Sequence, residues 1–115
     1  MIQLDTIVAS ATAPGRGAIS IIRLSGPLSV QIAQTCSRRQ LQPRVATYGD
    51  FYDNATPIDS GLWLFFPNPS SFTGEDVIEF QGHGGPVVIQ AIIDTLIRAG
   101  ARLARPGEFT ERAFL

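Results

Sequence analysis

The chain has 115 residues, of which 44% are hydrophobic and 17% are charged. That length is typical of a single domain, and that composition can fill a hydrophobic core, which argues against intrinsic disorder. The formal net charge is −1, which excludes a global field that would attract nucleic acid or a membrane surface.

In chain order, alternating β-branched and apolar residues predict strands, and apolar residues at four-residue spacing predict helices. The predicted strands cover 5–13, 18–26, 45–53, 61–66 and 75–82, with a short strand at 102–104; the predicted helices cover 27–37 and 86–99, and another helix begins within 108–115. This order predicts an α+β domain in which two main helices pack on an antiparallel or mixed sheet.

Three details of these elements are open to a structural test. The first helix is expected to bury Leu28, Ile32 and Cys36, which follow one another at four-residue spacing. In the second helix, Asp94 and Arg98 have the spacing of an ion pair. The strand "GLWLFF" (61–66) is apolar at every position, which is typical of a strand covered on both faces. Two helices cover one face only, so we expect a second copy of the chain to cover the other.

The residue types exclude several kinds of site. All nine basic residues are arginine, which excludes a Schiff-base lysine and the lysine of a Walker A motif. One cysteine and one histidine do not make an internal disulfide or a structural zinc site, so we expect no metal. This cysteine usage, with no signal-peptide pattern and no apolar run of about 18 residues, predicts a cytoplasmic protein without a membrane segment.

Two charged residues stand out as candidate ligand contacts. Arg23 lies within the apolar stretch "IIRLSG", where a guanidinium needs a ligand anion or a structural carboxylate such as Glu79 or Asp76. Glu79 lies near the end of the strand "DVIEFQG", where it can accept two parallel hydrogen bonds from an arginine or from the amidine edge of a heterocycle. A solvated edge strand is the alternative interpretation of Glu79.

The glycine-rich segments predict turns rather than catalysis. "PGRG" (14–17) precedes a strand and lacks the third glycine of a dinucleotide-binding motif, so it predicts a hairpin turn. In "QGHGGP" (81–86), glycines let the chain turn from a strand into a helix, and His83 is interpreted as a residue that sets the shape of this corner. We expect no catalytic residue, and Cys36 is interpreted as a core residue.

Three segments carry a family resemblance: "DTIVASATAPGRGAISIIRLSG", "SFTGEDVIEFQGHGGPVV" and "ARPGEFTERAFL". Together they span residues 5 to 115, and they resemble the N-terminal domain of the tRNA modification GTPases of the MnmE (TrmE) family. The resemblance implies a fold similar to one half of the folate-binding fold of the glycine-cleavage aminomethyltransferase. It implies that residues 1–115 are a tetrahydrofolate-binding and dimerisation domain, excised from a longer protein that also has a helical domain, a GTP-binding domain and a C-terminal cysteine motif.

The resemblance also implies the ligand and the partners. The cofactor is a tetrahydrofolate derivative such as 5-formyltetrahydrofolate, with Arg23 and Glu79 as its contacts and a further family lysine just beyond "ERAFL". GTP, potassium and magnesium belong to the absent GTP-binding domain, so this chain has no GTPase site of its own. The chain is expected to form a homodimer. In the full protein, folate supplies a one-carbon unit for the wobble uridine of certain tRNAs, with the flavin-dependent MnmG as partner.

Two other functions remain open. A pure dimerisation or tRNA-contact module would need no folate, and nine arginines suit contacts with RNA although the net charge gives only a weak footprint. A stand-alone transferase would need an acid/base pair and about twice this length. A titration with folate separates the three functions.

Overall fold

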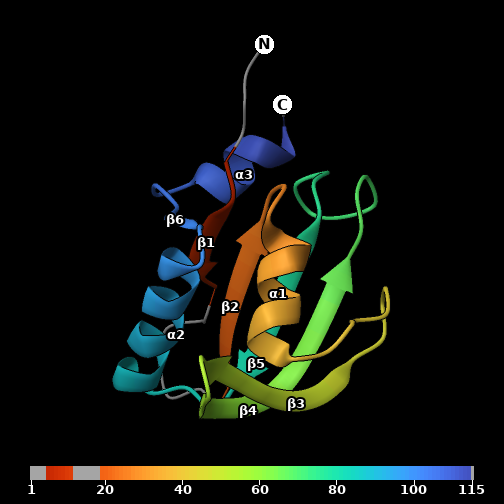
Figure 1. The fold of residues 1–115 in the computed structure, drawn as a ribbon. Helices are drawn as coiled ribbons and strands as arrows, with labels where there is room; N and C mark the ends of the chain where they lie inside the picture. Colours follow the sequence, from red (N-terminus) through yellow and green to blue (C-terminus); the bar gives the residue numbers. More distant parts are fainter. Residues whose placement is uncertain (1–4, 12–18, 115) are drawn as a thin grey trace.

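A computed structural model describes residues 5–11 and 19–114 of the chain. The strands are β1 (Ile7–Ser10), β2 (Ser20–Ser25), β3 (Thr47–Asp53), β4 (Thr56–Phe66), β5 (Val77–Gly82) and β6 (Arg102–Leu103), and the helices are α1 (Ser29–Ser37), α2 (Pro86–Arg98) and α3 (Glu108–Ala113). The strands form one sheet in the order β3-β4-β5-β2-β1-β6 (Figure 1), antiparallel except between β1 and β6. The predicted α+β class with a mixed sheet and two main helices is confirmed. The turn predicted at 14–17 lies outside the described residues.

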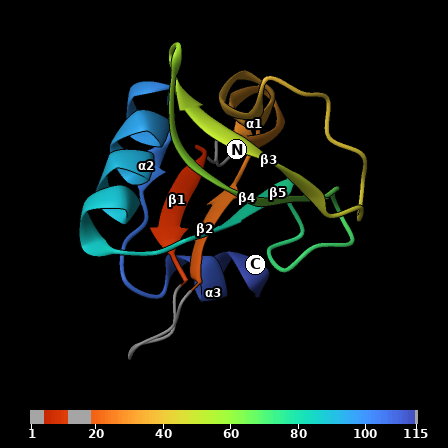
Figure 2. The ribbon, with the colours of Figure 1, turned by 90° about the horizontal axis from the view of Figure 1, so that it is seen from below.

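The hydrophobic core lies between one face of the sheet and the helices α1 and α2. Figures 1 and 2 show both helices on the same side of the strands, with α3 on the other side at one end of the sheet. The rings of Phe51, Trp63 and Phe80 contact one another in this core, with centroid separations of 4.8 to 5.2 Å. Ile32 from α1 and Ile92 from α2 belong to the same buried cluster. The alternation of the strands therefore fills one face with apolar side chains.

The opposite face of the sheet is only partly covered. On β4, Leu62 is exposed, and Leu64 and Phe66 are half-buried. Within one chain, segment 61–66 is therefore covered on one face only, as expected of two helices, and coverage of the other face by a second copy stays a prediction. The physical reason is that α1 and α2 pack on the same face, which leaves apolar side chains of β4 on the other face in contact with solvent.

The first helix begins later than the sequence predicts, at Ser29. Gly26 has a φ of 135° and lies so close to Thr6 that a Cβ atom at this position would be 2.6 Å from the Thr6 Cα atom. The backbone N–H of Leu28 donates to Thr6 Oγ1 at 2.7 Å. This turn holds Leu28 outside the core, where it is 38% exposed, whereas the other two positions predicted to be buried in the helix are buried.

The strand β4 begins at Thr56 rather than at the predicted position 61. Asn54 has a φ of 54°, which lets the chain reverse tightly between β3 and β4. Pro57 fits within β4 because only β3 pairs with that part of the strand; pairing with β5 begins at Leu62. The β3–β4 hairpin thus extends past the rest of the sheet.

The second helix is linked to β3 by a charged contact. Arg98 Nη2 donates to Asp53 Oδ2 at 2.9 Å, and Asp94 accepts a hydrogen bond from Gln90. The predicted pair between Asp94 and Arg98 is therefore wrong, because Arg98 forms its ion pair with Asp53 on β3 instead. With 13 residues α2 is the longest helix, and no helix in the described part of the chain has the length and apolar character needed to cross a membrane.

Candidate functional site

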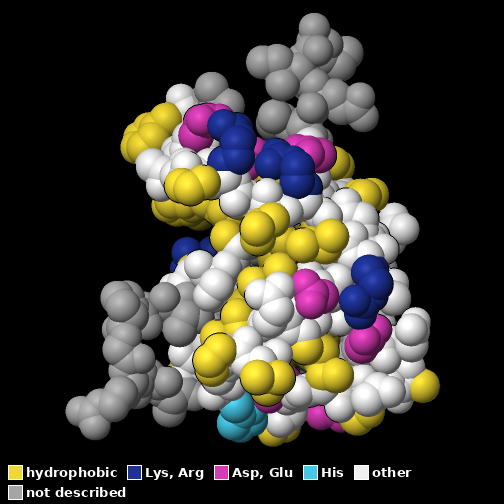
Figure 3. All heavy atoms as spheres, turned by 90° about the vertical axis from the view of Figure 1, so that its left-hand side faces the viewer, with side chains coloured by type: hydrophobic (Ala, Val, Ile, Leu, Met, Phe, Trp, Pro, Cys, Tyr) yellow, Lys and Arg dark blue, Asp and Glu magenta, His cyan; other side chains and the backbone are white. Residues whose placement is uncertain are grey.

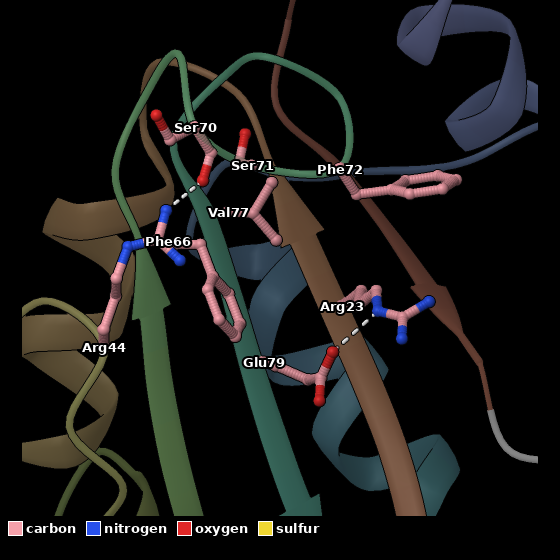
Figure 4. Close-up of a pocket in the computed structure, with 8 residues that line it drawn as sticks. All are labelled: Arg23, Arg44, Phe66, Ser70, Ser71, Phe72, Val77 and Glu79. Atoms are coloured by element: carbon pink, nitrogen blue, oxygen red, sulfur yellow. Dashed lines mark hydrogen bonds and ion pairs between the residues drawn. The ribbon is translucent and has the colours of Figure 1, made fainter.

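A hollow of about 510 Å³ lies on the face of the sheet that α1 and α2 leave uncovered. In Figure 4 both helices lie behind the strands, and the lining side chains lie in front of them. Strands β2, β4 and β5, the loop 67–76 and the connection before β3 supply the lining residues Arg23, Arg44, Phe66, Ser70, Ser71, Phe72, Val77 and Glu79. Both residues predicted as ligand contacts, Arg23 and Glu79, thus line one hollow.

Arg23 and Glu79 face each other across β2 and β5. The antiparallel register places these two residues directly opposite, so their side chains lie on the same face of the sheet. Arg23 Nε donates to Glu79 Oε2 at 2.7 Å. Glu79 and Asp76 were the two carboxylates expected as partners of Arg23. Arg23 pairs with Glu79, and Asp76 accepts hydrogen bonds from Asn68 instead.

The second oxygen of Glu79 also has a partner. Gln81 Nε2 donates to Glu79 Oε1 at 2.7 Å. The Glu79 side chain is 11% exposed, and one donor on each oxygen sets the orientation of its carboxylate. Each carboxylate oxygen can accept two hydrogen bonds, and the described residues leave one acceptor position on each for a planar pair of donors. Gln81 was not predicted as a site residue, although its position two residues after Glu79 places it on the same face.

Arg44 forms one side of the hollow and was missed by sequence analysis. Its guanidinium lies 5.7 Å from the centre of the Phe66 ring, and its Nη2 donates to the carbonyl oxygen of Ser70. Phe72, which is 55% exposed, lines the same hollow from the loop 67–76. The site therefore combines an ion pair on its floor with aromatic side chains and a second arginine at its edge (Figure 4).

A second hollow of about 510 Å³ adjoins the first, and Arg23 lines both. Its other walls are the end of β1 and the segment 103–110, which connects β6 to α3. The three segments that carry the family resemblance therefore meet around Arg23: the first contains Arg23 itself, the second contains Glu79, and the third contains most of 103–110.

Buried charges hold α3 at the end of this site. Arg112 is buried, with its side chain 3% exposed, and it forms ion pairs with Asp5 at 2.9 Å and with Glu75 at 3.0 Å. Glu75 in turn accepts a hydrogen bond from Ser25 on β2 at 2.7 Å. Figure 3 shows acidic and basic side chains gathered at this upper end of the molecule. The network joins the start of the described chain, the loop 67–76 and α3.

Glu108, on the first turn of α3, belongs to the same charged region. Arg102 donates to both of its carboxylate oxygens, at 3.0 and 2.7 Å, and the backbone N–H of Arg105 donates at 2.9 Å. These donors, the Arg102 side chain above all, lower the pKa of Glu108 to about 2. Hydrogen bonds from Arg102 likewise hold the pKa of Asp5 well below its ordinary value. Both carboxylates are therefore structural anions.

His83 lies at the opposite end of the sheet and away from the hollow. Its Nδ1 lies 2.9 Å from Asp59 Oδ1, and its backbone N–H donates to Asp59 Oδ2 at 3.0 Å. Gly82 leaves room for this carboxylate, because a Cβ atom there would be 2.2 Å from Asp59 Oδ2. These contacts agree with the prediction that His83 shapes the corner between β5 and α2.

Cys36 is a core residue, as predicted. The side chain lies on α1 and is 3% exposed. Burial raises the pKa of its thiol to about 11, so the thiolate that a nucleophile or metal ligand needs is scarce at neutral pH. Within the described residues, no group of three or more His, Cys, Asp or Glu side chains could hold a metal ion.

Comparison with known proteins gives one consistent result. Residues 6–115 match the family model described as the N-terminus of the GTP-binding protein TrmE. The chain is 60% identical over 112 residues to the tRNA modification GTPase MnmE of Ectopseudomonas mendocina and 60% identical over 113 residues to that of Vibrio cholerae. Each comparison covers 96% of this chain and 25% of the relative, so the chain spans about a quarter of the length of these relatives.

Proposed function

Since the chain belongs to the family of the TrmE N-terminus, we propose that it binds a reduced folate, 5-formyltetrahydrofolate or a related one-carbon form, in the hollow beside Glu79. The observation that carries this proposal is the partly buried Arg23–Glu79 pair on the floor of a hollow with aromatic walls. Taking a charged pair out of water costs free energy that the attraction within the pair repays only in part, so its place in an apolar strand face indicates a structural or binding purpose. A ligand with a planar donor edge gives it that purpose.

The residues present fit a pterin. The 2-amino group and the adjacent ring N–H of a pterin form a planar pair of donors, which matches one free acceptor position on each oxygen of Glu79. Phe66 and Phe72 offer aromatic surface for a flat ring system. Arg23 orients Glu79 through its Nε atom, and the described residues leave its further N–H donors for the ligand. When bound, the folate would supply a one-carbon unit.

We further propose that residues 1–115 act as the N-terminal domain of a longer cytoplasmic GTPase that modifies the wobble uridine of certain tRNAs. In that protein, GTP, potassium and magnesium would bind to another domain, and the partner would be the flavin-dependent MnmG. The names of the relatives, tRNA modification GTPases, support this proposal.

The uncovered face of the sheet supports a homodimer. The half-buried Leu64 and Phe66 and the exposed Leu62 lie on the same face as the candidate folate site. A second copy placed on this face would cover these side chains and would rebuild a two-half arrangement similar to the aminomethyltransferase fold. The folate would then lie at or near the interface between the copies.

Calorimetric titration of the chain with 5-formyltetrahydrofolate tests the proposal, with chromatography of the ligand afterwards. Saturable binding without conversion is the expected result. Absence of binding would favour the pure dimerisation or tRNA-contact module, and conversion of the folate by the chain alone would favour a stand-alone transferase.

A further inference from the structure

We infer that Arg44 binds the carboxylate end of the ligand and so makes the site selective for folates that carry a glutamate tail. This inference rests on the proposed function and extends it, because neither the family motifs nor the ion pair with Glu79 involves Arg44. The supporting observation is an arginine at the edge of the hollow with no carboxylate partner among the described residues, at the opposite side of the Phe66 ring from Glu79 (Figure 4).

Arg44 is held in place without being neutralised. Its backbone N–H donates to the carbonyl oxygen of Phe65 at 2.9 Å, which fixes the connection before β3 against β4. Its Nη2 donates to the Ser70 carbonyl oxygen, and its guanidinium lies beside the Phe66 ring. A guanidinium has five N–H donors, and the described residues engage one of them through Ser70. Arg44 therefore presents an oriented cation with free donors at the edge of the hollow.

The spacing suits a ligand with a ring at one end and an acid at the other. Leu64 lies directly opposite Glu79, and Phe66 follows two residues further along β4. Two residues of a strand span about 7 Å, and the Arg44 guanidinium lies 5.7 Å from the Phe66 ring. Glu79 and Arg44 thus lie on opposite sides of the Phe66 ring. The flat p-aminobenzoyl group of a folate can lie along this ring and carry its glutamate toward Arg44.

The competing explanation is that Arg44 only braces the loop 67–76 through Ser70. The two roles differ in one measurable respect. A brace supports the shape of the hollow and affects every ligand that enters it, whereas a carboxylate contact affects only ligands that have the carboxylate. The comparison therefore needs two ligands that differ in the glutamate alone.

The experiment titrates 5-formyltetrahydrofolate and 5-formyltetrahydropteroate, which lacks the glutamate, into the wild-type chain, Arg44→Gln and Arg39→Gln. Arg39 is an exposed arginine outside the hollow and serves as the matched control. We expect Arg44→Gln to lower the affinity for 5-formyltetrahydrofolate about tenfold and to leave the affinity for 5-formyltetrahydropteroate unchanged. We expect Arg39→Gln to change neither affinity. An equal loss for both ligands, or no loss for either, would overturn the role of Arg44.

A measurement on the wild-type chain keeps the inference testable if Arg44→Gln does not fold. The preference for the glutamate-bearing ligand should decrease as the salt concentration rises, because an exposed ion pair is screened. If the wild-type chain binds both ligands equally, the inference fails while the proposed function stands. If the wild-type chain binds neither ligand, the proposed function itself fails, and the inference fails with it.

Discussion

Arg112 donates to both the backbone and the side chain of Asp5, at 2.6 Å to the carbonyl oxygen and 2.9 Å to the carboxylate. Because Arg112 is buried among carboxylates, its removal leaves them without their shared cation. We expect Arg112→Leu to lower the free energy of unfolding by about 3 kcal/mol. Urea denaturation followed by the fluorescence of Trp63 measures this change. Arg105→Leu removes an exposed arginine of the same region and should cost less than about 1 kcal/mol; equal losses in the two variants would contradict the prediction.

The pKa values of Glu108 and Asp5 predict acid sensitivity. The ordinary pKa of Glu108 is 4.5 and its folded value is about 2, so the stabilisation from its charged form is complete above about pH 4.5 and is lost as the pH falls toward 2. The pKa of Asp5 is lowered as well and acts in the same direction. We expect Glu108→Gln to be less stable at neutral pH and to lose less stability on acidification than wild type. Parallel pH profiles of the unfolding free energy would rule this out.

Glu79 should determine folate affinity. Glu79→Ala removes the acceptor for the pterin donors, and we expect a loss of about 1.5–3 kcal/mol in binding free energy, the range for hydrogen bonds to charged groups. Calorimetry with 5-formyltetrahydrofolate measures the loss. Asp94→Ala removes an exposed carboxylate on α2 and is the matched control. Equal affinity of Glu79→Ala and wild type would remove this role from Glu79.

Lysine should not be able to replace Arg23 in folate binding. Arg23→Lys keeps the positive charge and loses the planar set of donors that orients Glu79. We expect a loss of about 1.5 kcal/mol in folate affinity, with the fluorescence of Trp63 unchanged as evidence of an intact fold. Normal binding by a folded Arg23→Lys would mean that the arginine has a structural role only.

The uncovered face of the sheet predicts self-association. Sedimentation of the chain over a concentration series should show a dimer, and 5-formyltetrahydrofolate should shift the equilibrium toward it, because a ligand bound by the dimer alone stabilises the dimer by mass action. Leu62→Asp places a charge on the exposed apolar surface of β4 and should weaken the association. A monomer at high concentration, with and without the ligand, is the outcome that excludes this prediction.

Local patterns predicted most of the elements, because the alternation of a strand and the spacing of a helix depend on neighbouring residues alone. They did not predict features that depend on contacts between segments distant in the sequence. The start of α1 depends on the contact between Gly26 and Thr6, and the choice of Asp53 over Asp94 as the partner of Arg98 depends on the position of β3. Neither relationship leaves a periodic signal in the sequence.

The sequence likewise predicted some residues of the candidate site and not others. Arg23 and Glu79 were found because a charge in an apolar strand needs a partner, and the register then placed them opposite each other. Gln81 was missed because glutamine in a strand is not unusual in itself. Arg44 was missed because it lies in a polar connection, and only the tertiary structure brings it beside Phe66.

The parallel pairing of β1 with β6 has a consequence for synthesis of the protein on the ribosome. Ile7 and Val8 lie in register with Arg102 and Leu103, so one edge of β1 has no partner until the chain has been made past residue 103. During that interval a nascent domain exposes an apolar strand edge, which is the kind of surface that pairs with other unfinished chains. This edge of β1 can therefore be closed only after β6 has been synthesised.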